Sequence, residues 1–266
     1  MNNVDKLREI MVALRDPDTG CPWDLAQDFA SIVPHTLEEA YEVAEAVEAG
    51  EMDELRDELG DLLFQVIFYA RLAEERGLFD FEQVAAGIVD KLIRRHPHVF
   101  GDAVVGNAEA QSQAWEADKA RERAEKLPHT GALAGVAVAL PAMTRAVKLQ
   151  KRAARVGFDW PEIAPVFAKV QEELEEVRAE VAVAGALTDN QVRIEEEIGD
   201  LLFACTNLAR QAHVEPETAL RHANRKFERR FAQMEMMAKA QGREVSELDL
   251  DEWEALWENV KVGEST

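Results

Sequence analysis

Cysteine, glycine, proline and aromatic residues are all scarce in this chain of 266 residues. Its two cysteines, Cys21 and Cys205, lie far apart and lack metal-ligand spacing, which argues against a disulfide framework or a zinc site. The longest apolar run spans residues 131–140 and stops at Pro141, so it is too short to cross a bilayer. The segment from Met1 to Arg15 is an amphipathic mixture that does not resemble a signal peptide. We therefore expect a soluble, cytoplasmic protein without a membrane partner.

Positive charge is also in short supply, because 30 Lys and Arg residues stand against 52 Asp and Glu residues, for a net charge of −22. Such a field repels the backbone of nucleic acids, so no nucleic-acid partner is expected. Small phosphate compounds are not excluded, because a divalent cation can bridge two anions. Hydrophobic residues make up 47% of the chain, so the acids do not belong to a disordered tail.

Long segments rich in Ala, Glu, Leu and Arg lie between the few glycines and prolines, and no segment alternates apolar and polar residues for long. The sequence therefore predicts an all-α fold. The predicted helices span residues 3–15, 36–49, 52–76, 81–95, 108–126, 141–155, 162–184, 189–211, 216–241 and 249–261. Turn residues at 127–131 predict a linker, and hence two domains at 1–126 and 127–266.

The two halves of the chain carry the same motifs in the same order and at nearly constant spacing. The matched pairs are Trp23 with Trp160, Glu38-Glu39-x-x-Glu42 with Glu172-Glu173-x-x-Glu176, Glu58-Leu-Gly-Asp-Leu-Leu-Phe64 with Glu197-Ile-Gly-Asp-Leu-Leu-Phe203, Lys91-x-x-Arg-Arg95 with Lys226-x-x-Arg-Arg230, and Trp115-Glu-x-x-Lys119 with Trp257-Glu-x-x-Lys261. Five ordered matches predict a tandem duplication of one helical bundle.

The acids of the first half fall on two consecutive predicted helices. On helix 36–49, helical periodicity places an apolar arc (Leu37, Ala40, Tyr41, Ala44 and Val47) opposite Glu38, Glu39, Glu42 and Glu45, which alone is typical of a solvated face. Helix 52–76 is apolar in nearly every direction except for a stripe of Glu58, Asp61 and Gln65. A helix of that kind is normally buried, so its carboxylates need partners.

The second half repeats this layout, with Glu197 and Asp200 on one apolar helix. A buried salt bridge is the ordinary explanation for such carboxylates, but the neighbours expected on the facing helix are Glu172, Glu173 and Glu176. Converging carboxylates repel one another unless protons or cations neutralise them. Oxygen ligands without Cys or paired His favour Mg²⁺ or Mn²⁺ over zinc. The doubled pattern therefore predicts a metal site.

Basic residues near these acids are candidates for binding phosphate oxygens. Lys226 and Arg230 share a helix face, although a surface salt-bridge helix explains them equally well, and Lys169 lies one turn before Glu173. Trp257 is a candidate for stacking on a base or sugar, with a core position as the alternative.

With these motifs assembled, the chain resembles the MazG family of nucleoside triphosphate pyrophosphohydrolases in its two-domain form. The resemblance rests on residues 21–24, both acidic sets, both Gly-Asp-Leu-Leu-Phe segments, and residues 148–160 and 224–231. It implies an all-α homodimer that converts a nucleoside triphosphate and water to the monophosphate and pyrophosphate with Mg²⁺, which clears aberrant or excess nucleotides. The implied metal ligands are Glu173, Glu176, Glu197 and Asp200, the catalytic residues are Glu172 and Glu173, and the nucleotide-binding residues are Lys169, Lys226, Arg230 and Trp257. A second candidate site in the first half comprises Glu38, Glu39, Glu42, Glu58, Asp61, Lys91 and Arg95.

Two other readings stay open: a non-catalytic acidic scaffold for dimerisation or regulation, and an enzyme specific for one nucleotide such as dUTP. We expect the C-terminal half to carry most of the activity, because Lys169 stands where the first half has the mostly neutral His35. The spacer between acidic motifs is also longer there, with 21 positions from Glu176 to Glu197 against 16 from Glu42 to Glu58.

Overall fold

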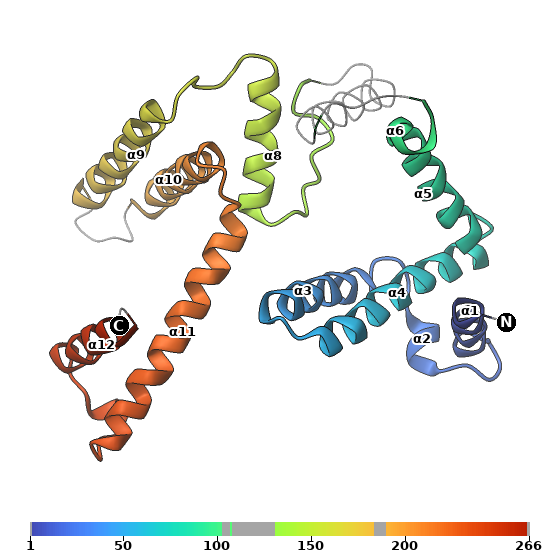
Figure 1. Cartoon of the computed structure of the whole chain (residues 1–266), viewed down its shortest axis with the longest axis horizontal. Coiled ribbons are helices and arrows are strands. Elements are labelled where there is room, and N and C mark those ends of the chain that lie inside the picture. The colour runs from blue at the N-terminus through green and yellow to red at the C-terminus, as the bar shows by residue number, and fades with distance from the viewer. Residues whose placement is uncertain (1, 103–106, 108–130, 184–189, 265–266) are drawn as a thin grey trace. The chain divides into compact units, whose positions relative to one another are not determined.

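The computed structural model describes residues 2–102, 107, 131–183 and 190–264, and these residues contain helices and no strand (Figure 1). The all-α prediction is confirmed. The chain divides into two compact units, Met1–Lys119 and Ala120–Thr266, called unit 1 and unit 2 below. No helix in the described part of the chain is both long and apolar enough to span a membrane. The predicted helix 108–126, with its Trp115 motif, and nearly all of the predicted linker lie outside the described residues.

Unit 1 is built around an antiparallel pair of helices, α3 and α4. Its helices are α1 (Asn3–Leu14), α2 (Pro22–Ala26), α3 (Val33–Ala49), α4 (Met52–Glu75), α5 (Phe81–Arg95) and α6 (Pro97–Phe100). Helix α3 begins earlier than predicted, at Val33, because Pro34 fits the first helical turn, where its missing N–H is not needed. It ends at Gly50, whose φ of 76° is the left-handed conformation that glycine adopts easily. Glu51 then leads directly into α4.

The core of unit 1 lies where α1 and the residues before α3 pack against the second half of α4. Its buried members are Met11, Ile32, Ile67, Phe68 and Leu72. Helices α2 and α6 were not predicted, because each is too short to show a hydrophobic period.

Unit 2 repeats the pair as α9 (Ala164–Val183) and α10 (Gln191–Gln211), and α8 (Ala142–Arg155) packs on α10. Helix α11 (Pro216–Ala240) begins under a cap in which the Glu215 carboxylate accepts from two backbone N–H groups. After a short 3-10 turn, η2 (Val245–Glu247), helix α12 (Leu250–Glu264) folds back on α11. Figure 1 shows α12 against the far part of α11, away from the α9–α10 pair. A separate cluster of Met234, Ala238, Leu256 and Val260 forms the core of this contact.

The apolar arc of α3 is largely exposed in the single chain. Leu37, Tyr41 and Val47 are 46%, 52% and 54% exposed. The face toward α4 instead carries Thr36, whose hydroxyl lies 3.2 Å from the hydroxyl of Tyr69, and Glu39. Helix α3 therefore turns an acid inward and leaves its larger apolar side chains uncovered in this single chain.

Helices α4 and α10 also leave matching apolar residues uncovered. On α4 these are Leu59, Leu63 and Val66, and the alignment that pairs Glu58 with Glu197 places Ile198, Leu202 and Cys205 of α10 opposite them. Each set follows an i, i+4, i+7 spacing and forms one stripe on its helix. We call them the uncovered stripes. The prediction that these two helices are buried all round holds only for part of their surface in one chain.

Candidate active site

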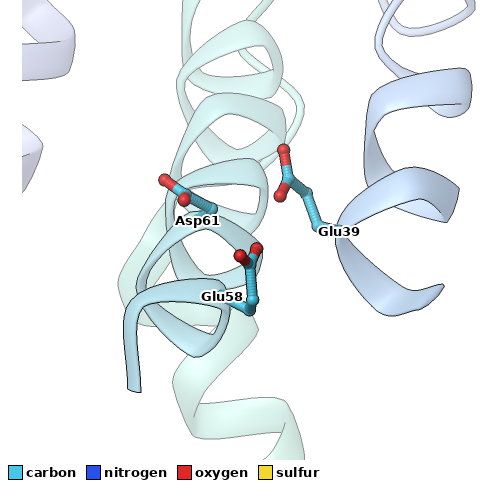
Figure 2. Close-up of side chains that lie close together, drawn as sticks. All are labelled: Glu39, Glu58 and Asp61. Carbon is cyan, nitrogen blue, oxygen red and sulfur yellow. The ribbon is translucent and has the colours of Figure 1, made fainter. Parts of the chain in front are cut away.

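In unit 1, three carboxylates meet across the α3–α4 pair. One oxygen each of Glu39, Glu58 and Asp61 lies within 4.8 Å of the others. Glu39 reaches from α3, and Glu58 and Asp61 lie one turn apart on α4 (Figure 2). The Gln65 amide donates to Glu39 over 3.4 Å, which is one turn further along the same polar stripe.

This clustering makes the charged state of the unit 1 acids unfavourable. Partial desolvation, and then the negative charges of Asp61 and Glu42, raise the pKa of Glu39. Desolvation also raises the pKa of Glu58, followed by the charge of Glu42 and then of Asp61. Glu42 thus lies near enough to repel both acids although it is not one of the three that converge. A cation would relieve this repulsion.

Unit 2 holds the equivalent cluster between α9 and α10. One oxygen each of Glu173, Glu176 and Glu197 lies within 4.8 Å of the others, and Glu173 is buried. The pKa of Glu176 is raised, chiefly because of its hydrogen bond with the neighbouring Glu173 carboxyl, then by desolvation and by the charges of Glu173 and Glu197. We call these three residues the acidic trio.

Lys169 lies at the edge of the acidic trio. Its ammonium nitrogen is 2.7 Å from Glu173 and 2.9 Å from Glu172, and these two bonds raise its pKa further above the ordinary lysine range. The equivalent position in unit 1 is His35, whose ring nitrogen lies 3.6 Å from Glu38. A permanent positive charge therefore stands beside the acids of unit 2, where unit 1 has an imidazole.

A cavity of about 570 Å³ adjoins the acidic trio. Lys169, Glu173 and Asp200 are among the residues that line it. Asp200 is exposed and is not among the three converging acids, although its unit 1 counterpart, Asp61, is. Taken together, the two units present the same four acids around one position on a helix pair.

Other predicted residues lie elsewhere. Glu172 is exposed and pairs with Lys169 outside the trio. Arg230 and Trp257 belong to the α11–α12 contact, where the guanidinium lies 5.3 Å from the indole ring and pairs with Glu264. Lys226 is on the same helix α11 as Arg230, and no described contact joins these residues to the trio.

In unit 1, Lys91 and Arg95 lie on α5, which packs near the C-terminal end of α4, whereas the acids lie on its N-terminal half. Figure 1 shows α5 leading away from the α3–α4 pair. The structure therefore brings together the predicted acids and Lys169, and it does not bring the predicted arginines to them within one unit.

Sequence reasoning missed two buried amides on the walls of the unit 2 cavity, Gln150 and Asn207. It also missed the ion pair in which the Arg210 guanidinium holds the Asp159 carboxylate at 2.5 Å. Hydrogen bonding to Arg210 lowers the pKa of Asp159. The sequence did contain a signal for the two amides, because Gln150 on α8 and Asn207 on α10 each interrupt an apolar helix face, and buried amides need hydrogen-bond partners.

The donor set of each cluster suits a hard divalent cation. It consists of carboxylate oxygens only, drawn from two helices and close enough to share one ion. Desolvation raises the pKa of Glu39 and Glu58, and the hydrogen bond with Glu173 raises that of Glu176; repulsion between the acids adds to each shift, and a bound cation would offset that repulsion.

Fold and site together define a class: tandem all-α units in which a helix pair holds clustered carboxylates. The chain belongs to the MazG family, since the MazG nucleotide pyrophosphohydrolase domain matches residues 27–100 and 164–234. These two ranges contain both acidic clusters. The expected family membership and the tandem repeat of the domain are confirmed.

Two relatives match along nearly the whole chain. A nucleoside triphosphate pyrophosphohydrolase from Escherichia coli (strain K12) is 51% identical over 261 residues, which covers 98% of each protein. The nucleoside triphosphate pyrophosphohydrolase/pyrophosphatase MazG from Thermotoga maritima is 40% identical over 262 residues, covering 98% of this chain and 97% of that protein. A nucleoside triphosphate pyrophosphohydrolase from Mycobacterium tuberculosis matches a shorter stretch, being 39% identical over 145 residues, which cover 52% of this chain and 42% of that protein.

Proposed function

We propose that this chain is a Mg²⁺-dependent nucleoside triphosphate pyrophosphohydrolase that acts on ribo- and deoxyribonucleotides, with Mn²⁺ as a substitute ion. Its proposed role is to remove aberrant or excess nucleotides from the cytoplasmic pool. The observation that carries the proposal is the acidic trio of unit 2, which adjoins both Lys169 and a cavity. The names of the full-length relatives support the reaction.

In this reaction water adds to the α-phosphorus, and the bond from that phosphorus to the bridging oxygen breaks. The products are a nucleoside monophosphate and pyrophosphate, and the proton lost by the water goes to a carboxylate. Glu173, Glu176, Glu197 and Asp200 would hold the metal ion, which when bound offsets phosphate charge and lowers the pKa of a water molecule. Glu172 or Glu173 accepts the proton, and Lys169 binds a phosphate oxygen.

We assign most of the activity to unit 2. A lysine ammonium beside the acids attracts a triphosphate, and unit 1 has no lysine at the equivalent position, which is His35. In the full chain, Glu173→Gln should abolish pyrophosphate release and Glu39→Gln, its unit 1 counterpart, should leave most of it. The reverse result would assign the reaction to unit 1 and overturn the lysine argument.

The proposal includes a homodimer. The uncovered stripes of α4 and α10 are apolar surfaces that two helices of a bundle normally bury against two more. Lys226, Arg230 and Trp257 lie away from the acids of their own unit, so we propose that they contact the nucleotide in the unit 2 site of a second copy. Light scattering that returned 29.8 kDa throughout the micromolar range would contradict the dimer.

The decisive experiment is a panel of ribo- and deoxyribonucleoside triphosphates, assayed for pyrophosphate and monophosphate with Mg²⁺, with Mn²⁺ and with a chelator. Metal-dependent release from several nucleotides is the expected result. Release from one nucleotide only, such as dUTP, would favour the specialist enzyme. No release from any would favour an acidic scaffold and refute the proposal.

A further inference from the structure

The cavity beside the acidic trio is lined both by charged residues and by apolar and amide residues, and Asp200 and Asn207, two turns apart on α10, mark its acidic end and its amide end. Apart from Lys169, Glu173 and Asp200, its walls come mainly from apolar and aromatic side chains of α8, α9, α10 and the segments before α8 and α9, namely Leu133, Leu149, Phe158, Trp160, Val166 and Phe203. A nucleobase has two apolar faces and a polar edge, so it requires aromatic or aliphatic walls with a few fixed hydrogen-bonding groups. The carboxylate end of the cavity suits phosphates, and the other end suits a base.

Gln150 provides the first fixed polar group in these walls. Its amide nitrogen donates to the backbone carbonyl of Phe203 over 3.0 Å, which fixes the orientation of the amide. The side-chain oxygen is then buried and has no hydrogen-bond partner among the described residues. A buried acceptor of this kind is costly unless a ligand donates to it.

Asn207 provides the second group, one with the opposite polarity. Its side-chain oxygen accepts from two guanidinium nitrogens of Arg210, at 2.9 and 2.7 Å, and Arg210 is held in turn by Asp159. The Asn207 amide nitrogen is thereby left as a donor on the cavity wall. An acceptor and a donor fixed in one cavity match the edge of a nucleobase, which also offers both.

Unit 1 has no such amide at the matching place. The alignment that pairs Glu58 with Glu197 places Phe68 opposite Asn207 and Gln65 opposite Ala204. Phe68 is 1% exposed and packs in the unit 1 core, so it fills the position where unit 2 has an amide on a cavity wall. Gln65 is longer than Ala204 and is turned toward Glu39.

We infer that the unit 2 cavity is a base-binding compartment, in which the Gln150 oxygen accepts from the base edge and the Asn207 amide donates to it. Ala204 and Asn207 open this compartment in unit 2, whereas Gln65 and Phe68 close it in unit 1. The inference rests on the proposed function and deepens it, because it makes the nucleoside part of the substrate a specific ligand of unit 2. It also separates the two units on grounds independent of Lys169.

The test separates binding at the base end from binding at the phosphate end. Asn207→Asp keeps an acceptor for Arg210 and removes the donor, and Asn207→Leu removes both. Inhibition of pyrophosphate release by a nucleoside monophosphate reports on the base end, and inhibition by inorganic pyrophosphate reports on the phosphate end. We expect each variant to raise the inhibition constant of the monophosphate, and the KM of the triphosphate, by about tenfold. The inhibition constant of pyrophosphate should change less than twofold.

Gln191→Leu is the matched control, because it removes an exposed amide from the first turn of the same helix and should change none of these constants. An equal rise in the inhibition constants of the monophosphate and pyrophosphate, or no rise in that of the monophosphate, would overturn the inference while leaving the proposed function in place. Equilibrium dialysis of the monophosphate with the full chain provides a readout that does not need turnover. Failure of the proposed function would instead appear as no hydrolysis by the unaltered chain.

Discussion

Arg15, directly after α1, joins three parts of unit 1, and its replacement by Met should destabilise that unit strongly. The guanidinium donates to both oxygens of Glu75 on α4, at 2.9 and 2.7 Å, and to the backbone carbonyl of Asp24. It also lies 5.5 Å from the ring centre of Phe68. Arg15 is 8% exposed, so these interactions form largely away from water.

The expected loss in free energy of unfolding depends on which interactions Glu75 keeps after Arg15 is replaced. Removing one partner of a buried ion pair costs about 3–5 kcal/mol, because the other charge is left without compensation. Glu75 keeps a bond of 3.0 Å to Arg71, which places the expected cost near the lower end, at about 3 kcal/mol. For a unit of this length, that corresponds to a fall in Tm of about 10–15 °C.

The pH dependence supplies a second check. The bond to Arg15 lowers the pKa of Glu75, so the folded unit binds that proton less tightly than the unfolded chain does. The stabilisation is therefore fully present above the unfolded pKa of about 4.5 and is lost as the pH falls through the lower folded value. The difference in Tm between the native chain and the variant should shrink accordingly below about pH 4.5.

Thermal unfolding followed by circular dichroism and calorimetry measures both quantities. Arg56→Met is the control, since Arg56 is exposed on α4 and pairs only with exposed acids, and its Tm should stay almost unchanged. Pyrophosphate release at room temperature should persist in Arg15→Met, because Arg15 and its partners lie in unit 1 and most of the activity is assigned to unit 2. The reasoning would be refuted if Arg15→Met lowered the Tm no more than Arg56→Met does, or if the difference in Tm between the native chain and Arg15→Met grew as the pH fell.

Two further predictions concern the site and the dimer. Glu197→Gln should raise the Tm of the metal-free protein by relieving repulsion with Glu176, yet it should weaken Mg²⁺ affinity and turnover. Glu196→Gln, the control, changes an exposed residue of the same helix and should alter none of these quantities. If Mg²⁺ affinity were unchanged in Glu197→Gln, Glu197 would not be a metal ligand. If Lys226 serves the site of a second copy, mixing inactive Glu173→Gln and Lys226→Ala chains should restore about a quarter of the native rate, because half of the random dimers then hold one intact site. A mixture that stays inactive after subunit exchange would refute the crossed arrangement.

Much of the fold could be predicted from local pattern. The boundaries of the long described helices agree closely with the periodicity, and the convergence of Glu173, Glu176 and Glu197 was predicted from two helices that each carry acids at helical spacing. Periodicity reports which residues share a face of a helix, and it does not report what lies against that face. That is why the pattern on α3 could not show that Tyr41 is exposed in the single chain.

The cavity could not be predicted for a related reason. Whether Asn207 lines a cavity or is packed in the core depends on the sizes of side chains from other helices. In unit 1 the equivalent residue, Phe68, is packed in the core. The predicted grouping of Arg230 with the acids was a statement about tertiary contact that spacing along the chain does not contain. The role of Arg230 in nucleotide binding stays a prediction.

The thiol of Cys205 is exposed in the uncovered stripe of α10, at the place that Val66 occupies on α4. If a second copy covers that stripe, alkylation of this thiol becomes a direct reporter of assembly, because modification requires the stripe to be open to reagent. Its labelling rate should then fall as protein concentration rises, while Cys21, in the other unit and half-buried, serves as an internal reference. The native chain thus carries its own probe for association, without an introduced label.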